Sequence, residues 1–419
     1  MYLCIDLKSF YASVECVERG LDPYKDNLIV ADLSRTEKTI CLAASPAIKA
    51  LGVSSRCRVF EIPKNIEYIA APPRMSLYME YSARIYSIYL KYVSKEDIHV
   101  YSVDEVFIDV TDYLTMYKMD AKSLGIMIID DIVRSTGITA TCGIGTNLYL
   151  AKIALDISAK HTEDHMGYLT EELFRETLWD HEPLTDFWRI GPGTARRLAK
   201  VGIYNMGQIA AADEDMLYDM FGVDAELLID HAWGIEPTLI SDIKTYSPTT
   251  NSITSGQVLD RDYDHDEGRL IVKEMADLLC LELVYRECVT ESITLHIGYS
   301  NALKLPPAHG SSHLAFPTSS AKIIVEAVEK LYDEIKDRNY PMRRAFVYFN
   351  KIVPEGFEQY NMFVDPKELE REHSMQKAII DIKSKFGKNA ILKGMNLEKG
   401  AKTIERNSQI GGHRSGEEE

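Results

Sequence analysis

Residues 97–110, DIHVYSVDEVFIDV, contain two strand-like apolar runs that are separated only by Asp104 and Glu105. In one unbroken strand these neighbouring carboxylates would point to opposite faces of the sheet. A bend or hairpin tip at Asp104 and Glu105 would direct both side chains into one site. The stretch therefore predicts two adjoining strands with a pair of carboxylates where they meet.

A third carboxylate, Asp6, ends the short buried strand predicted at YLCID, residues 2–6. A carboxylate is costly to bury unless it is paired or bound to a cation. Three carboxylates gathered at strand ends would repel one another, and Mg²⁺ ions, which prefer oxygen ligands, would relieve that repulsion. An exposed turn at Asp104 and Glu105 with a solvated Asp6 also fits, and spacing alone does not decide between the two.

Strands and helices alternate around these carboxylates, which predicts an α/β core of the catalytic type. Near the end of this α/β core lies GIGT at 143–146. It lacks the Gly-Lys-Ser/Thr ending of a P-loop and is a weak indication of a phosphate site. The helix that follows carries Lys152, Asp156 and Lys160 at i, i+4 spacing, which favours a solvated, ion-paired helix face.

From about 170 to 240 the chain is predicted to be helical, with the segment IGPGTARRLAKVGI at 190–203. The backbone N–H groups of its tight Gly-Pro-Gly turn open onto a helix N-terminus, a suitable place for a phosphate. Arg196 and Arg197 add positive charge on that helix. The segment therefore favours contact with a phosphate backbone over a plain αα-hairpin.

The polar stretch 241–252, SDIKTYSPTTNS, predicts a linker. After it, strand, helix, strand, strand, helix and strand are expected at 252–259, 267–285, 291–299, 311–316, 319–337 and 342–350. This order is the signature of the split βαβ, ferredoxin-like fold.

The polar residues beyond this domain predict partial disorder. Within them, Gln359, Met362 and Phe363 have the form of a short docking peptide.

The length of 419 residues limits the number of domains, and the formal net charge of -17 limits the kinds of partner. At roughly 150 residues per domain, two to four domains are expected. The acidic balance argues against a general nucleic-acid binder, although the 190–203 segment is locally basic.

Seven cysteines without a Cys-x-x-Cys pair argue against a zinc site or a secreted disulfide framework. A charged N-terminus and the lack of a long apolar run predict a cytoplasmic protein without a membrane span.

Four of these stretches resemble the Y-family DNA polymerases of the UmuC/DinB type, most closely the bacterial UmuC-like branch. They are IDLKSFYASVE at 5–15, YSVDEVFIDVTD at 101–112, GIGTNLYLAKIALDISAK at 143–160 and the 190–203 segment. The resemblance covers about residues 1–352 and implies a multi-domain α/β right-hand polymerase. Its parts would be palm at 1–18 and 72–169, fingers at 19–71, thumb at 170–240, linker at 241–249, little finger at 250–352 and a clamp-binding tail at 353–419.

The activity that this resemblance implies is error-prone, DNA-directed DNA polymerisation for translesion synthesis in an SOS-type DNA-damage response. Its partners would be primer-template DNA, deoxynucleoside triphosphates and a sliding clamp, and a need for accessory subunits stays open. Asp6, Asp104 and Glu105, with the backbone carbonyl of Leu7, would bind two Mg²⁺ ions and carry the catalysis. The alternative, a non-catalytic DNA-binding scaffold, is disfavoured because all three carboxylates are present.

The resemblance also implies binding roles for other residues. Tyr11 matches the family's steric gate against ribonucleotides, and Phe10 would form the floor of the sugar pocket. Lys49 and Pro46 stand where many relatives have arginine and tyrosine, and lysine lacks the bidentate fork of arginine. Nucleotide contacts are expected from Phe10, Tyr11, Ser45, Lys49 and Lys160, DNA contacts from Gly191, Gly193, Arg196 and Arg197, and clamp contacts from Gln359, Met362 and Phe363.

Overall fold

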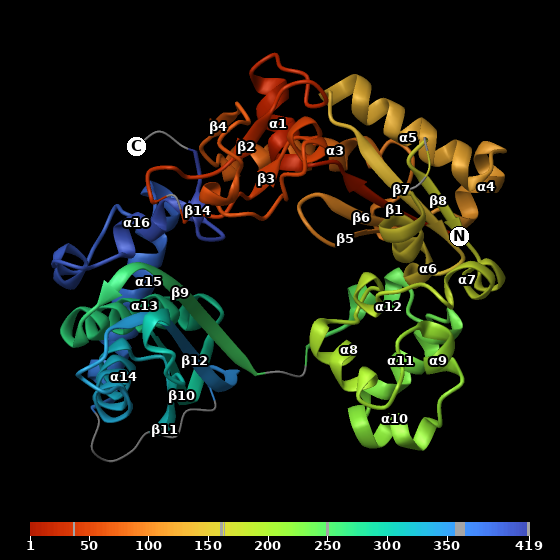
Figure 1. Ribbon diagram of the computed structural model, residues 1–419. Coiled ribbons are helices and arrows are strands. Elements are labelled where there is room, and N and C mark those ends of the chain that lie inside the picture. The colour runs from red at the N-terminus through yellow and green to blue at the C-terminus, as the bar shows by residue number, and fades with distance from the viewer. Residues whose placement is uncertain (37, 160–161, 163, 249–250, 357–364, 417–419) are drawn as a thin grey trace. The chain divides into compact units, whose positions relative to one another are not determined.

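The computed structural model describes residues 1–416 apart from 37, 160–161, 163, 249–250 and 357–364. It divides into two compact units, one formed by Met1–Tyr246 with the chain from His413 on, and the other by Ser247–Gly412. Figure 1 shows helices and strands in both units. The predicted α/β multi-domain fold is confirmed.

The first unit is organised around a five-stranded sheet with the order β5-β6-β1-β7-β8. The central strand β1 (Tyr2–Leu7) runs antiparallel to β6 (Glu105–Asp109) and β7 (Ala140–Gly145). β5 (Ile98–Val100) and β8 (Met166–Leu169) form the two edges. Asp6 lies directly opposite Glu105 in this register, so both side chains belong to the same face of the sheet.

Helices pack on both faces of this sheet. α5 (Ala121–Thr136) adjoins α3 (Met75–Tyr89) and lies on the face of Leu3 and Cys142, which a Cβ at Gly125 would touch. α6 (Leu148–Ile153) and the π-helical turn Ala154–Ser158 lie on the other face, which also bears Asp6. A Cβ at Gly143 or Gly145 would overlap the backbone of α6. The glycines of the GIGT motif therefore allow close helix packing.

A smaller three-stranded sheet with the order β3-β2-β4 has its own core. β2 (Leu28–Val30) is parallel to β4 (Ile69–Ala71) and antiparallel to β3 (Ala43–Ala44). The helix α1 (Phe10–Glu18) packs against β2 and β3, and the helix α2 (Pro46–Ala50) follows β3 in the chain. In the region of the large sheet, the short helix α4 (Thr111–Tyr117) lies between β6 and α5 in the chain.

The helical region predicted from about 170 is present and packs around Phe174, Leu198 and Leu217. Its helices are α7 (Glu171–Leu178), α8 (Pro192–Ala199), α9 (Met206–Ala210), α10 (Glu214–Phe221), α11 (Asp224–Trp233) and α12 (Ile240–Thr245). The linker predicted to begin at residue 241 is wrong over its first residues. Ile240 is buried against the large sheet, so α12 is anchored in this unit.

The second unit has the predicted split βαβ order. Its elements are β9 (Ser252–Tyr263), α13 (His265–Tyr285), β10 (Cys288–Tyr299), β11 (Ala308–Thr318), α14 (Ala321–Ile335) and β12 (Met342–Pro354). The sheet order is β11-β10-β12-β9. Ile293, Leu295 and Ile297 alternate along β10 and are buried in a core shared with both helices, as a strand with one covered face requires.

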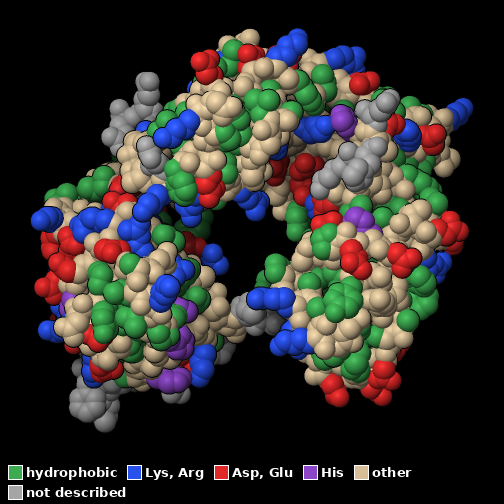
Figure 2. Space-filling view, in the orientation of Figure 1, with side chains coloured by type: hydrophobic (Ala, Val, Ile, Leu, Met, Phe, Trp, Pro, Cys, Tyr) green, Lys and Arg blue, Asp and Glu red, His purple; other side chains and the backbone are tan. Residues whose placement is uncertain are grey.

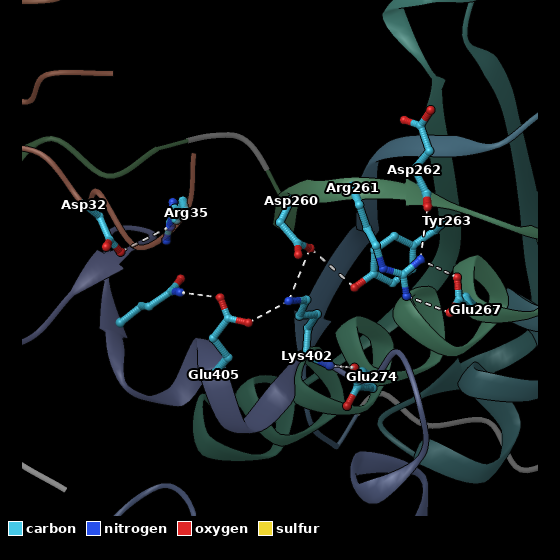
Figure 3. A network of polar contacts seen from close by, with 11 residues as sticks. Asp32, Arg35, Asp260, Arg261, Asp262, Tyr263, Glu267, Glu274, Lys402 and Glu405 are labelled. Atoms are coloured by element: carbon cyan, nitrogen blue, oxygen red, sulfur yellow. Dashed lines mark hydrogen bonds and ion pairs between the residues drawn. The ribbon is translucent and has the colours of Figure 1, made fainter. Parts of the chain in front are cut away.

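The polar residues after 364 are folded, so the predicted partial disorder is wrong for the part of the tail that the structure describes. They form α15 (Pro366–Phe386), a 3-10 turn at Gly394–Leu397, α16 (Thr403–Asn407) and β13 (Gln409–Ile410). Glu274, buried in α13, accepts hydrogen bonds from the Asn396 side chain at 2.9 Å and from the Lys402 and Thr403 N–H groups at 2.7 and 3.2 Å. Lys402 also forms an ion pair with Asp260 (Figure 3). Polar contacts rather than an apolar stripe hold this segment.

Charged side chains of both signs are interspersed over the visible face (Figure 2). The acidic side chains are therefore not gathered into a single patch on this face. No helix within the described ranges is long and apolar enough to cross a membrane.

Candidate active site

Asp6, Asp104 and Glu105 meet where the central strands end. Asp6 is paired with Glu105 across the β1–β6 ladder, and the Leu7 N–H donates to the Asp104 carbonyl oxygen at 2.9 Å. Residues 102–104 bend before β6 begins at Glu105. The predicted break between the two strands therefore brings the carboxylates together.

Asp6 is half-buried, and the other two carboxylates act on its charge. Its pKa is raised to about 7, first by burial and then by the negative charges of Asp104 and Glu105. Lys152 opposes this shift. A carboxyl group whose charge is disfavoured by its surroundings gains from a nearby cation. Asp6 is therefore not a fully solvated strand end.

Lys152, on α6, is the basic partner of these carboxylates. Its Nζ lies 2.8 Å from Glu105 Oε1 and 3.2 Å from the Asp156 carboxylate. The side chain is buried, so the predicted solvated helix face is wrong at this position. Sequence reasoning did not assign Lys152 to the site. The available signal was a lysine on a helix whose neighbouring positions are almost all apolar.

In this structure the three carboxylates do not enclose a cation position. Within the described ranges, no three His, Cys, Asp or Glu side chains form a group suited to hold a metal ion. Asp104 accepts a hydrogen bond from Ser102 Oγ at 2.7 Å, and Glu105 is held by Lys152. The oxygen donors, and the unfavourable negative charge of Asp6 in these surroundings, fit the chemistry of Mg²⁺.

An aromatic stack lies beside the carboxylates at the start of α1. Tyr11 stacks on Tyr78 of α3, with ring centroids 4.5 Å apart and planes inclined by 15°. Phe10 is buried, and its ring centroid is 5.7 Å from that of Tyr11. The Tyr78 hydroxyl donates to the buried Glu15 carboxylate at 2.7 Å, which fixes the ring on which Tyr11 rests.

Two lysines extend the site on the same side. The pKa of Lys49 is lowered because burial outweighs the attraction of Asp6, and the pKa of Lys8 is lowered by burial and then by Lys49. Lys49 Nζ also donates to Ser9 Oγ at 2.8 Å. Two ammonium groups that repel each other close to Asp6 form a suitable site for a polyphosphate. Lys8 was not predicted to take part.

Other predicted binding residues do not join this cluster. Ser45 is buried, and its hydroxyl donates to the Asp26 carbonyl oxygen at 2.8 Å while it caps α2, so the structure gives it a structural role. Lys160 lies outside the described residues, as do the clamp residues Gln359, Met362 and Phe363.

The predicted DNA-contacting residues meet on one exposed turn of the helical region. Gly191 precedes α8, and a Cβ at Gly191 or Gly193 would meet nothing within 4 Å, so the backbone is open to a ligand. Arg196 is exposed, and its Nε donates to the Pro192 carbonyl oxygen at 3.1 Å. The Arg197 guanidinium lies 4.3 Å from the centroid of the Phe221 ring. Arg197 is therefore partly engaged within the protein.

This combination of a carboxylate-bearing sheet, an exposed glycine turn and a split βαβ unit is typical of template-directed nucleotidyl-transfer enzymes. Residues 5–156 match the impB/mucB/samB family, and residues 250–362 match the C-terminal domain of that family. The chain is 30% identical over 416 residues to the putative UV-damage repair protein UvrX of Bacillus subtilis (strain 168), covering 99% of this chain and 97% of UvrX. It is 29% identical to DNA polymerase IV 2 of the same organism, covering 98% and 97% of the two chains.

A solved chimera of the Y-family DNA polymerases Dbh and Dpo4 has the same fold, with a TM-score of 0.63 at 20% identity. The match covers 84% of this chain and 99% of the chimera. The chain belongs to the impB/mucB/samB family, which comprises Y-family DNA polymerases of the UmuC/DinB type.

Proposed function

We propose that this DNA-directed DNA polymerase carries out error-prone translesion synthesis in an SOS-type damage response. Family membership and similarity to proteins named for UV-damage repair and DNA polymerase IV support this function. The observation that carries it is the pairing of Asp6 with Glu105 across β1 and β6, with Asp104 at the adjoining bend. Such a cluster suits nucleotidyl transfer to a primer 3′-OH.

The parts of the chain take the family's roles in this proposal. The large sheet is the palm (1–18 and 72–169), the small sheet the fingers (19–71) and the helical region the thumb (170–240). The split βαβ core is the little finger (250–352). The exposed turn at Gly191 and Gly193, with Arg196 and Arg197, contacts the DNA backbone through its open N–H groups and its guanidinium groups.

Asp6, Asp104, Glu105 and the Leu7 carbonyl would hold two Mg²⁺ ions. When bound, these ions lower the pKa of the primer 3′-OH and neutralise charge that develops on the transferred phosphate. Asp104 and Glu105, which contact Ser102 and Lys152 in this structure, would be the residues that hold the ions, and Lys152 would keep Asp156 as a partner. Lys8 and Lys49, together with Lys160, bind the triphosphate and orient it toward the carboxylates.

We expect Tyr11→Ala to weaken discrimination against ribonucleotides by roughly tenfold to a hundredfold, because the ring that would collide with a 2′-hydroxyl is removed. The measurement is the ratio of kcat/KM for a deoxynucleotide and the matching ribonucleotide. Tyr11→Phe is the matched control, since it keeps the ring on Tyr78. An unchanged ratio in Tyr11→Ala would refute the gate assignment.

Gln359, Met362 and Phe363 would bind a sliding clamp as a short peptide. Phe363→Ala should reduce clamp-stimulated synthesis by about tenfold, as expected when one apolar anchor of a small interface is lost. Synthesis without the clamp should stay unchanged. Phe386→Ala, which removes an exposed phenylalanine of α15, is the control. Equal loss of both activities in Phe363→Ala would count against a docking role.

Primer extension by the full chain tests the function itself. With a primed template, the four deoxynucleotides and Mg²⁺, we expect template-directed extension, including extension past a damaged base. Chelation of the divalent cation should stop it. DNA binding without any extension, on both undamaged and damaged templates, would instead identify a DNA-binding scaffold.

A further inference from the structure

The last described residues, 413–416, belong to the first unit although residues 247–412 form the second. The chain thus leaves the first unit after Tyr246 and rejoins it at His413. We call residues 413–416 the return segment. It begins with β14 (His413–Arg414).

One end of the return segment contacts the loop that follows β2. Arg414 Nε lies 3.2 Å from the Asp32 carboxylate, and Arg414 Nη2 donates to Ser34 Oγ at 3.1 Å. Asp32 is only 8% exposed and also faces Arg35 (Figure 3). A carboxylate with so little access to water depends on such partners. Arg414 is therefore a specific contact of this loop.

The other end contacts the beginning of α3. The Ser415 carbonyl oxygen accepts the Ser76 N–H at 2.9 Å. This N–H is in the first turn of α3, where helix donors have no partner within the helix. Gly416 has a φ of +85°, and a Cβ there would lie 2.7 Å from Arg74 Cα. Only glycine fits where the return segment crosses Arg74.

Arg74 links this contact to the aromatic stack of the active site. Its Nε and Nη2 donate to the two Glu15 carboxylate oxygens at 2.9 and 2.8 Å. The Glu15 side chain has no exposed surface and also accepts the Tyr78 hydroxyl. Tyr78 in turn supports the ring of Tyr11. The path starts at the exposed Gly416 and passes through the half-buried Arg74 and the buried Glu15 and Tyr78 to the half-buried Tyr11.

We propose that the return segment positions the nucleotide site. It ties the loop of Asp32 to the start of α3, and through Arg74, Glu15 and Tyr78 it holds the Tyr11 ring in place. The inference rests on the proposed role of Tyr11 as the sugar gate. No residue of the return segment needs to touch the nucleotide for this effect.

The first test is Gly416→Ala in the full chain. We expect KM for a deoxynucleotide to rise about threefold to tenfold, because a gate ring displaced by a fraction of an ångström no longer fits the sugar. Discrimination against ribonucleotides should fall by a similar factor, while kcat stays within about twofold. Gly411→Ala is the matched control, since Gly411 also has a positive φ but open space around a Cβ. Wild-type KM and sugar preference in Gly416→Ala would overturn the proposal.

A second variant keeps the test decisive if Gly416→Ala does not fold. Arg414→Glu places a negative charge against Asp32 and should reproduce the KM and sugar-preference changes. Arg414→Lys retains the positive charge and should restore most of the wild-type behaviour. If Arg414→Glu keeps the wild-type KM and sugar preference, the Asp32 contact does not position the site and the proposal fails.

Tyr11→Ala separates this inference from the function on which it rests. If it alters sugar preference while Gly416→Ala and Arg414→Glu do not, the gate stands and only the return-segment inference is lost. If Tyr11→Ala leaves sugar preference unchanged, the gate assignment and this inference fail together. Primer extension by the wild type tests the polymerase assignment separately from both.

Discussion

Replacing Asp104 by alanine is expected to slow primer extension by at least roughly a thousandfold, equivalent to about 4 kcal/mol of lost transition-state stabilisation. Asp104 lies at the bend beside Asp6, whose pKa its charge helps to raise. Without it the site loses one of the three carboxylates proposed to hold the cations. The measurement is single-turnover extension of a primed template at saturating Mg²⁺.

A matched control and a binding measurement make this prediction specific. Asp112→Ala removes an exposed aspartate of α4 and should extend primers at the wild-type rate. Binding of Mn²⁺, followed without DNA or nucleotide, should weaken in Asp104→Ala and stay unchanged in Asp112→Ala. Extension by Asp104→Ala at more than about a tenth of the wild-type rate would refute the metal assignment.

The strand ends that carry the carboxylates were predictable because their signal is local, whereas spacing alone did not decide whether the three residues meet. Asp104 and Glu105 interrupt two apolar runs, and Asp6 ends a third, so strand pairing alone brings them to one edge. The split βαβ order was predictable for the same reason, since its strands and helices differ in the period of their apolar residues. In both features each strand or helix has its own short periodic pattern of apolar residues.

Other parts of the site depend on contacts that no local pattern contains. Lys152 resembles a solvated lysine in the sequence, and only the packing of α6 on Gly143 and Gly145 buries it beside Glu105. Tyr78 is one of several tyrosines in α3, and its role becomes visible only when it stacks on Tyr11. Ser45 was assigned to the nucleotide from resemblance, whereas its local geometry makes it a helix cap.

The folding of the tail also depends on contacts that no local sequence pattern contains. Its polar composition predicts disorder when hydrophobic burial is the only criterion. Glu274 precedes its partners Asn396, Lys402 and Thr403 by more than 120 residues. Hydrogen bonds between a buried acceptor and donors so distant in sequence produce no periodic pattern in either segment.

Glu274→Ala should therefore destabilise the second unit by about 3 to 5 kcal/mol, because it leaves the Asn396 side chain and the Lys402 and Thr403 N–H groups without their acceptor in a buried place. For a unit of this size we expect the thermal midpoint to fall by roughly 10 °C or more. Hydrogen exchange resolved along the chain should show the largest increase around residues 393–407.

Glu326→Ala, which removes an exposed glutamate of the neighbouring helix α14, should change the midpoint by less than about 2 °C. Glu274→Gln should fall between the two, because the amide oxygen still accepts hydrogen bonds while its NH₂ group faces donors. If Glu274→Ala and Glu326→Ala were equally stable and residues 393–407 exchanged alike in both, the buried carboxylate would not be what holds the tail on the βαβ core. Exchange that increases at 393–407 without a lower midpoint would mean instead that the tail docks on a core that is stable without it.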